Sequence, residues 1–340
     1  MTLEKSRMTI DNILTGKYYE VFDNDSEKIR KTYRDLVKKF HPDVCSDSRA
    51  SEAIAKLHLL YKEAEDHYNN NSWKESNVVT FHRDDGKKAI IRNYKYQTSN
   101  EMGRVWVSSS CICYEFGSSK KKYFDNFLSR ATSFKYANAE MKSHFSYFLP
   151  TILDHFQADG NSYIIIKNYP ELYPLGLVKE VFKKPEHAAW LTTKILDICN
   201  FLQFNNISHN GICAENCFIN LEMHSVHLFG GWQYSVPLSS KLIGMPKKVF
   251  DNVKLLVTDD KHSQNILDLS AAKDLVREAS NGSSYIKLTD QGFNPLFVDF
   301  LFKKPEEEPF EEYSIWENVR RKVWPEHKFI KVDTPADVWE

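Results

Sequence analysis

Two short stretches of the sequence gather side chains that could do chemistry. The first is His41-Pro42-Asp43, which sets an imidazole beside a carboxylate. Proline disfavours helix in the residue before it, so a helix that reaches His41 must end there. Both polar side chains are then left on a stiff turn, where they can exchange hydrogen bonds with a partner. Residues 27–40 before the turn hold six basic and two acidic side chains, and a merely solvated face is the alternative interpretation.

The second stretch is residues 207–220, in which His209, Cys213 and Cys217 recur every four residues. Such spacing could form one face of a metal-binding helix. The six cysteines include no C-x-x-C pair, however, so zinc-ribbon and thioredoxin motifs lack their basic unit. Because a resemblance described below explains these positions better, we predict no metal and no cofactor.

Two helices must position the first stretch. Residues 27–40 carry apolar side chains at helical spacing: Ile29, Tyr33, Leu36 and Phe40. The opposite face carries three cations: Lys31, Arg34 and Lys38. A second helix after the turn has its own apolar stripe: Ala50, Ile54, Leu57, Tyr61, Ala64 and Tyr68. Two facing stripes predict an antiparallel helical hairpin with an aromatic and leucine seam.

Three runs of this hairpin carry a family resemblance: KYYEVF (17–22), IRKTYRDLVKKFHPD (29–43) and AIAKLHLLY (53–61). Together, and in this order, they resemble the J domain of DnaJ-type co-chaperones. The tripeptide alone would occur often by chance, but the three runs combined are specific. We therefore predict a J domain over residues 13–70, about a sixth of the chain.

The resemblance implies a partner and a role for each residue of the site. In this family the basic helix docks on an acidic surface of a DnaK-type chaperone, and the loop triggers ATP hydrolysis there. Carried over, Lys31, Arg34 and Lys38 would seat the complex, while His41, Pro42 and Asp43 would form the trigger. No Gly/Phe-rich segment follows residue 70, and the cysteine-rich zinc module of full DnaJ proteins is absent. The remaining residues would therefore choose an unidentified protein client or anchor.

Beyond residue 70 the pattern changes from helices to strands. Residues 71–77 are polar and without periodicity, which predicts a linker. Residues 78–170 are predicted to form a β-rich small lobe, interrupted by a helical block at 123–149, and residues 171–340 a helical large lobe. Three β-prone runs fall in the small lobe: KKAIIRNYKY (87–96), GRVWVSSSCICYEF (103–116) and NSYIIIKNY (161–169).

Two runs of the large lobe carry a second resemblance: ISHNGICAENCFIN (207–220) and SVHLFGGW (225–232). In order and spacing they resemble the catalytic loop of protein kinases, H-x-D-x-K-x-x-N, followed by the metal-binding D-F-G. His209 and Asn216 match the loop. The catalytic aspartate becomes Gly211 and the loop lysine becomes Cys213. Gly230 stands where the metal-binding aspartate would be.

The small lobe departs from the kinase pattern as well. Residues 97–103 hold one glycine where a phosphate-covering loop has three, and strand 111–116 has no lysine, although Lys120–Lys122 follow it. Glu140 could match the usual glutamate partner of that lysine, and Asp268 the anchor of a buried helix. Phosphoryl transfer needs a base, metal ions and cationic clamping, so the substitutions predict an inactive, kinase-like domain and no enzyme.

The last segment, residues 313–324, has Trp316, Val319 and Val323 on one side of an amphipathic helix. We predict that this helix is the last of the large lobe and contributes to the core. Docking of a client on an exposed tryptophan stripe is the alternative.

Composition limits the classes of function. A formal net charge of −1 gives no case for nucleic acid or membrane partners. No apolar run is typical of a signal peptide or a membrane span, and the six cysteines are predicted to be reduced thiols in a cytoplasmic protein. The predicted fold class is α+β, with a small all-α J domain followed by a two-lobed protein-kinase-like domain.

Two other functions and one other fold remain open at this point. An atypical kinase or nucleotide transferase could be regulated through the J domain, since Asn216 is retained. A decoy could occupy the chaperone without stimulating it, although an intact His41-Pro42-Asp43 argues against this. The large domain could also be an unrelated α+β fold. The sequence names neither the client nor the oligomeric state.

Overall fold

The computed structural model describes residues 8–70, 73, 77–326, 331–332, 334–335 and 338–339. The chain divides into two compact units, which are Met1–Val79 with Ile90–Asn93, and Thr80–Ala89 with Tyr94–Glu340. Most of the predicted linker, namely residues 71–72 and 74–76, lies outside the described residues.

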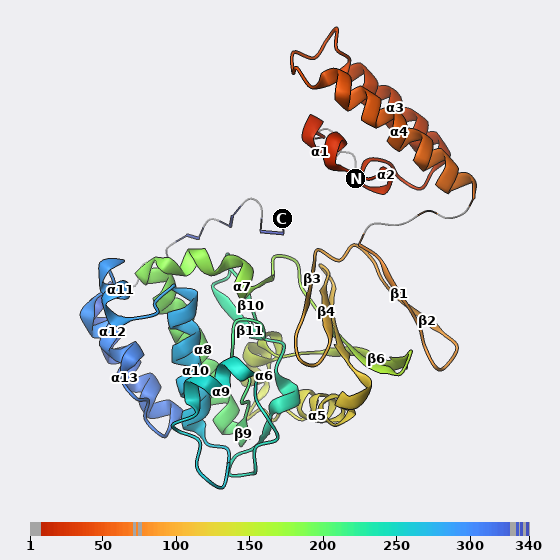
Figure 1. Ribbon diagram of the computed structural model, residues 1–340. Coiled ribbons are helices and arrows are strands. Elements are labelled where there is room, and N and C mark those ends of the chain that lie inside the picture. Colours follow the sequence, from red (N-terminus) through yellow and green to blue (C-terminus); the bar gives the residue numbers. More distant parts are fainter. Residues whose placement is uncertain are drawn as a thin grey trace. The chain divides into compact units, whose positions relative to one another are not determined.

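The first unit contains helices that are drawn in red and orange in Figure 1: α1 (Ile10–Thr15), α2 (Tyr18–Val21), α3 (Ser26–Phe40) and α4 (Ala50–Asn69). Helix α3 begins after Asp25, whose side chain accepts a hydrogen bond from the backbone N–H of Lys28. It ends at His41, as the proline after that residue predicts. Helices α3 and α4 lie side by side as the expected hairpin.

The apolar faces of this hairpin agree with the prediction on α3 and differ from it on α4. Residues Ile29, Leu36 and Phe40 of α3 are buried. The buried residues of α4 are Ala50, Ala53, Leu57, Leu60 and Ala64. The prediction was wrong for Tyr68, which is 38% exposed. Helices α1 and α2 also pack on α4, so its buried face is wider than a single seam and includes Ala53 and Leu60.

A five-stranded antiparallel sheet with the strand order β3-β4-β5-β7-β6 forms the strand-rich part of the second unit. Its strands are β3 (Tyr96–Ser99), β4 (Arg104–Val107), β5 (Cys111–Phe116), β6 (Ile152–Ala158) and β7 (Asn161–Lys167). Strands β1 (Val79–His82) and β2 (Lys88–Ile91) form a separate two-stranded sheet. Strand β6 was not predicted, because it is an edge strand in which only Phe156 and Ala158 are buried.

One face of the sheet packs against helix α5 (Lys121–Ala131). Tyr114 and Phe116 point to this face, where the Phe127 ring lies 5.5 Å from that of Tyr114 and 6.1 Å from that of Phe116. On the opposite face Phe81 of β1 packs on Trp106, with ring centroids 5.4 Å apart. The helical block predicted at 123–149 consists of two helices, α5 and α6 (Ala139–Phe145), and a 3-10 turn follows them.

The helix-rich part follows, as the sequence predicts. Its helices are α7 (Leu175–Val178), α8 (Pro185–Phe204), α9 (Lys247–Val253), α10 (Asn265–Ala279), α11 (Tyr285–Asp290), α12 (Pro295–Phe302) and α13 (Pro309–Val323). Its short strands are β8 (Tyr173–Pro174), β9 (Ile207–Ser208), β10 (Cys217–Asn220), β11 (Ser225–Leu228) and β12 (Val236–Pro237). They pair as β11-β10-β8 and β12-β9, which fixes both ends of the segment between β9 and β10.

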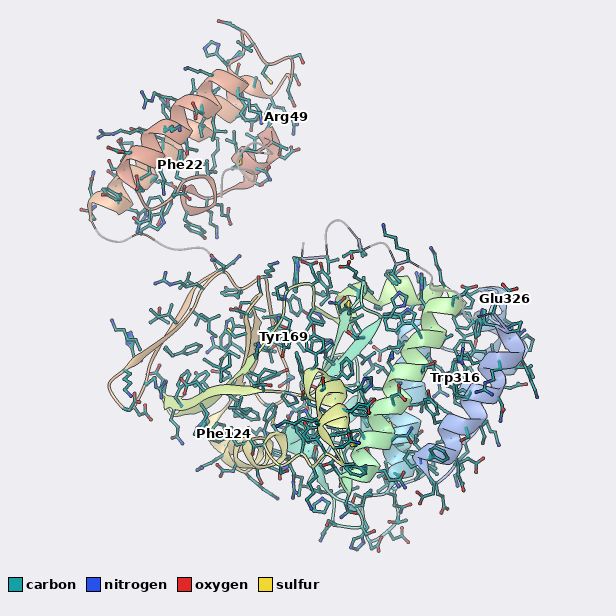
Figure 2. All side chains as sticks on the ribbon, turned by 180° about the vertical axis from the view of Figure 1, so that it is seen from behind. Phe22, Arg49, Phe124, Tyr169, Trp316 and Glu326 are labelled. Atoms are coloured by element: carbon teal, nitrogen blue, oxygen red, sulfur yellow. The ribbon has the colours of Figure 1, made fainter. Side chains whose placement is uncertain are left out.

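Helix α13 confirms the core interpretation of the last amphipathic segment. Trp316 is fully buried among the helices (Figure 2), and its indole N–H donates to the hydroxyl of Thr193 on α8 at 2.8 Å. Glu312 of the same helix forms a buried ion pair with Lys273 of α10 at 2.5 Å. Among the described residues, no helix combines the length and the apolar character needed to cross a bilayer.

Candidate functional site

The His41-Pro42-Asp43 loop leaves α3 as an exposed turn. The side chains of His41 and Asp43 are 48% and 86% exposed. The backbone N–H of Asp43 donates to Nδ1 of His41 at 3.2 Å, and the carboxylate lies 3.4 Å from the same nitrogen. An accepting Nδ1 puts the proton of a neutral imidazole on Nε2. The ring can then donate to a partner from Nε2, while the Asp43 carboxylate accepts.

The predicted cationic residues are exposed on the same helix. Lys31, Arg34 and Lys38 all face solvent, opposite the buried Ile29 and Leu36. Lys38 lies in the last turn of α3, next to the loop. The predicted cations therefore lie on the exposed face of the helix that leads into the turn.

The second cluster is built on the segment between β9 and β10. The Asp268 carboxylate of α10 accepts hydrogen bonds from the backbone N–H groups of His209 at 2.7 Å and Asn210 at 2.8 Å. Complete burial raises the pKa of Asp268 to about 6, and the two backbone donors oppose the shift. Asp268 therefore anchors the segment from a buried helix, as its predicted position implied.

All five predicted positions of this cluster lie together. The side-chain amide of Asn216 donates to the carbonyl of Gly211 at 2.8 Å and to the sulfur of Cys213 at 3.2 Å. The N–H of Gly230 donates to the Asn216 carbonyl at 3.0 Å, and the N–H of Gly211 donates to Nδ1 of His209 at 3.2 Å. The side-chain amide of Asn216 is thus bonded to groups of its own segment.

The histidine and the cysteines of this segment are neutral in their surroundings. Burial lowers the pKa of His209 to about 3, so its imidazole is uncharged at neutral pH. Burial likewise raises the pKa of the Cys213 and Cys217 thiols, which disfavours the thiolate that metal binding and nucleophilic attack require. Among the described residues, no group of three His, Cys, Asp or Glu side chains could hold a metal ion.

The loop predicted at 97–103 is shorter in the structure. Residues up to Ser99 belong to β3, and only a tight turn remains. In this turn the Asn100 side chain accepts hydrogen bonds from the backbone N–H groups of Met102 at 2.9 Å and Gly103 at 3.3 Å. Since the Asn100 side chain engages these donors, they are not directed at a ligand.

The structure gives no support to the possible match for Glu140. Glu140 is exposed on α6, whereas α5 is the helix that contacts β5. Asn126 of α5 instead donates to the carbonyls of Gln233 and Ser235, both at 2.9 Å. The hydroxyl of Tyr234 from this segment donates to Glu101. The sequence pattern carried no signal for these contacts, because each joins residues more than a hundred positions apart.

A cavity of about 300 Å³ lies beside the cluster. It is lined by the turn after β3, the segment that holds Cys213 and Asn216, and the start of α9. Its size falls at the lower end of small-ligand sites. Carboxylates of Glu101 and Glu215 and the amines of Lys247 and Lys248 line the same space.

Glu115 of β5 holds the strand-rich part together and gives it a pH dependence. Its buried carboxylate accepts hydrogen bonds from Arg104 at 2.8 and 3.0 Å and from the Tyr163 hydroxyl at 3.0 Å. Chiefly through Arg104, these bonds lower the pKa of Glu115 from 4.5 to about 2. The folded protein then binds fewer protons than the unfolded chain between those values. The contribution of Glu115 to the free energy of unfolding is therefore present above pH 4.5 and is lost as the pH falls toward 2.

Glu115→Gln is expected to lower the free energy of unfolding by about 1.5–3 kcal/mol at pH 7, which is typical of hydrogen bonds to a charged group. The deficit relative to the natural protein should shrink toward pH 3, and urea unfolding at both pH values measures it. Glu140→Gln, on an exposed surface, is the control and should change stability by less than about 0.5 kcal/mol. An equal deficit at both pH values would contradict the expected role of the carboxylate.

Comparisons with known proteins give likenesses of shape and none of sequence. No family model matches the sequence. No curated protein matches it either. Among solved structures, vaccinia related kinase 3 superposes with a TM-score of 0.48 and 12% sequence identity, over 74% of this chain and 94% of that one.

Proposed function

We propose that the protein is a J-domain co-chaperone. Its first unit would bind a DnaK-type chaperone and stimulate ATP hydrolysis in that partner. Its second unit would be a kinase-like domain without phosphoryl-transfer activity that binds a protein client or an anchor. The observation that carries the proposal is the exposed imidazole–carboxylate turn at the end of an exposed cationic helix face.

The geometry of the turn supports a trigger over a structural role. The Asp43 side chain is 86% exposed, and among the described residues of its unit only His41 of the same loop lies within ion-pair distance of its carboxylate. A carboxylate held only by its own loop is available to a cation of a partner. The neighbouring Lys31, Arg34 and Lys38 would steer an acidic surface toward it through long-range attraction.

The second cluster supports a binding role for the large domain. Asp268 holds the His209 segment as the resemblance to kinases implies. The groups that phosphoryl transfer needs are replaced at Gly211, Cys213 and Gly230. On strand β5, where the family has its lysine, Tyr114 points into the core, and its buried hydroxyl has no hydrogen-bond partner among the described residues.

The proposal is tested by ATP hydrolysis in a DnaK-type chaperone, measured in single turnover with the full chain added. The natural protein should accelerate hydrolysis. The charge reversal Lys31→Glu/Arg34→Glu should raise the concentration needed for half-maximal stimulation at least about tenfold, because steering is lost and becomes repulsion. Added salt should narrow that difference, since it screens exposed charges.

Lys62→Glu is the matched control, because Lys62 is an exposed cation on α4 rather than on the α3 face. It should leave stimulation within about twofold of the natural protein, as surface changes outside an interface do. No acceleration by the natural protein, or an equal loss with Lys62→Glu, would refute the proposal.

A further inference from the structure

Helix α1 precedes the first of the three runs that resemble a J domain, which begins at residue 17. Its start is capped reciprocally: the Thr9 hydroxyl accepts from the N–H of Asn12 at 3.2 Å, and the Asn12 side chain accepts from the N–H of Thr9 at 2.9 Å. Ile10 and Ile13 are 6% and 0% exposed and pack in the core of the unit with α4. The helix is therefore seated firmly on the hairpin.

Contacts from α1 and the residue before its cap bracket the trigger loop. On the near side, the ammonium of Lys39, two positions before His41, donates to the carbonyl of Met8 at 2.9 Å. On the far side, the guanidinium of Arg49, just before α4, forms an ion pair with Asp11 at 2.5 Å. The connection between α3 and α4, residues 41–49, is thus bonded near both ends to one short segment, residues 8–11.

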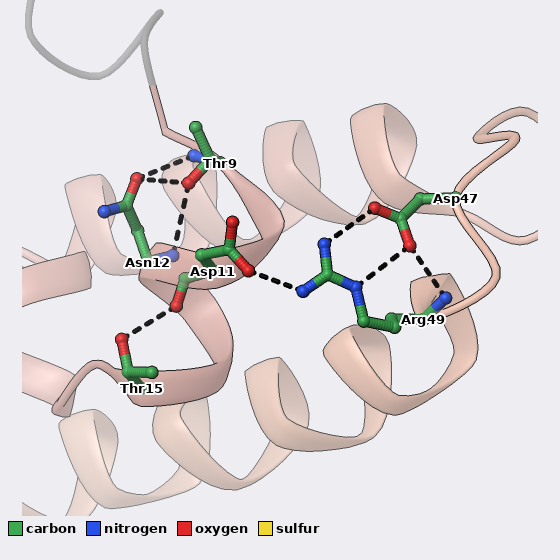
Figure 3. Close-up of polar contacts among 6 residues, drawn as sticks. All are labelled: Thr9, Asp11, Asn12, Thr15, Asp47 and Arg49. Atoms are coloured by element: carbon green, nitrogen blue, oxygen red, sulfur yellow. Dashed lines mark hydrogen bonds and ion pairs between the residues drawn. The ribbon is translucent and has the colours of Figure 1, made fainter.

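Arg49 is the centre of the far contact, as Figure 3 shows. The same guanidinium donates to the carboxylate of Asp47 at 3.2 and 3.0 Å, and the backbone N–H of Arg49 donates to it at 2.9 Å. Hydrogen bonds from Arg49 lower the pKa of Asp47, which keeps its charge on the pair. One planar group therefore joins α1, the base of the loop and the start of α4, an arrangement that a lysine could not reproduce.

We propose that residues 8–11 act as a strap that holds the His41-Pro42-Asp43 loop in its exposed conformation, with Arg49 as the positioning residue. A loop held at both ends has fewer conformations to lose when a partner binds it, so pre-organisation improves affinity without adding a contact. The strap should therefore change the affinity for the chaperone, whereas Asp43 should change the rate of the stimulated ATP hydrolysis. The consequence for the chaperone rests on the proposed function, but the ordering of the loop does not.

Hydrogen exchange in the full chain tests the ordering directly. The N–H groups of Val44 and Cys45 donate to the His41 carbonyl at 2.9 and 2.8 Å, so their exchange reports on the loop. Arg49→Gln and Asp11→Asn should each speed it about two- to fivefold, which is the range for loss of an exposed ion pair. Exchange in the double variant Arg49→Gln/Asp11→Asn should be no faster than in Arg49→Gln. The exchange rate in Arg49→Lys should lie between those of the natural protein and Arg49→Gln. Glu63→Gln, an exposed charge far along α4, should change nothing.

The chaperone ATPase provides the second measurement. Arg49→Gln should raise the half-maximal concentration by the same two- to fivefold and leave the maximal rate unchanged. Unchanged loop exchange in both single variants would overturn the strap. A lower maximal rate with unchanged exchange would overturn it too, because Arg49 would then act on the partner directly. If the exchange changes while the natural protein stimulates no chaperone, the strap stands and the proposed function fails.

Discussion

Asp43→Asn is expected to reduce the stimulated ATPase rate of the partner at least about thirtyfold. Removing one side of a charged contact that is buried in a complex typically costs about 2–5 kcal/mol. The substitution keeps the size of the side chain and removes only its charge. Because the side chain is 86% exposed in the free protein, folding should be affected by less than about 0.5 kcal/mol.

Single-turnover hydrolysis with saturating co-chaperone measures this effect, and thermal unfolding verifies the fold of the variant. Asp35→Asn is the matched control, since Asp35 is an exposed acid on α3 itself. It removes an acid from a basic face, so it should preserve stimulation or improve it. Full stimulation by Asp43→Asn would show that the loop is not a trigger, even if the protein binds the chaperone.

The hairpin could be predicted from the sequence because its determinants are local. The α3 stripe, the cap at Asp25 and the stop at Pro42 each act within a few residues. The strap escaped prediction because its contacts are long-range: Lys39 bonds 31 positions away and Arg49 bonds 38 positions away. The Thr9–Asn12 cap that begins α1 was a readable local signal, but periodicity alone does not reveal a helix of so few residues.

In the cluster around His209 and Asn216, too, the local spacing could be predicted from the sequence and the long-range contacts could not. The motif order placed His209, Asn216 and Gly230 in one site. In the structure the paired strands β10 and β11 bring Gly230 back to Asn216. The pattern could not reveal what closes the site. The Tyr234–Glu101 contact joins a turn to a segment 133 positions away, and the misplaced Glu140 followed from treating α5 and α6 as one helical block.

Gly230→Asp would place a carboxylate where the sequence resembles the metal-binding D-F-G of kinases. It is expected to destabilise the protein by about 3–5 kcal/mol, the cost of an uncompensated buried charge. A Cβ atom at Gly230 would lie 2.5 Å from the Asn216 side-chain oxygen and 3.1 Å from its Cα. Such a distance is shorter than normal contacts, so Asn216 would have to move. Its bonds to Gly211 and Cys213 would then be lost.

A side chain at Gly211 or Gly231 would also meet close contacts. A Cβ at Gly211 would lie 3.1 Å from the Gly231 carbonyl, and Gly231 itself has a φ of +84°, with only 2.5 Å between its own added Cβ and the His209 ring. The triple variant Gly211→Asp/Cys213→Lys/Gly230→Asp should therefore not bind Mg²⁺ and ATP. The segment packs closely because these positions are glycines. Substituting the residues of the kinase motif one by one is therefore not expected to create a nucleotide site.

Urea unfolding and thermal shift together measure this prediction. Gly176→Asp is the matched control, because an added Cβ there meets nothing within 4 Å, and it should be nearly neutral. A magnesium-dependent shift with ATP in the natural protein or in the triple variant would instead favour an enzyme, since bound nucleotide at a hundredfold excess over Kd stabilises by about 2.7 kcal/mol. Loss of stability without any nucleotide shift is the outcome that a closed, binding-only domain requires.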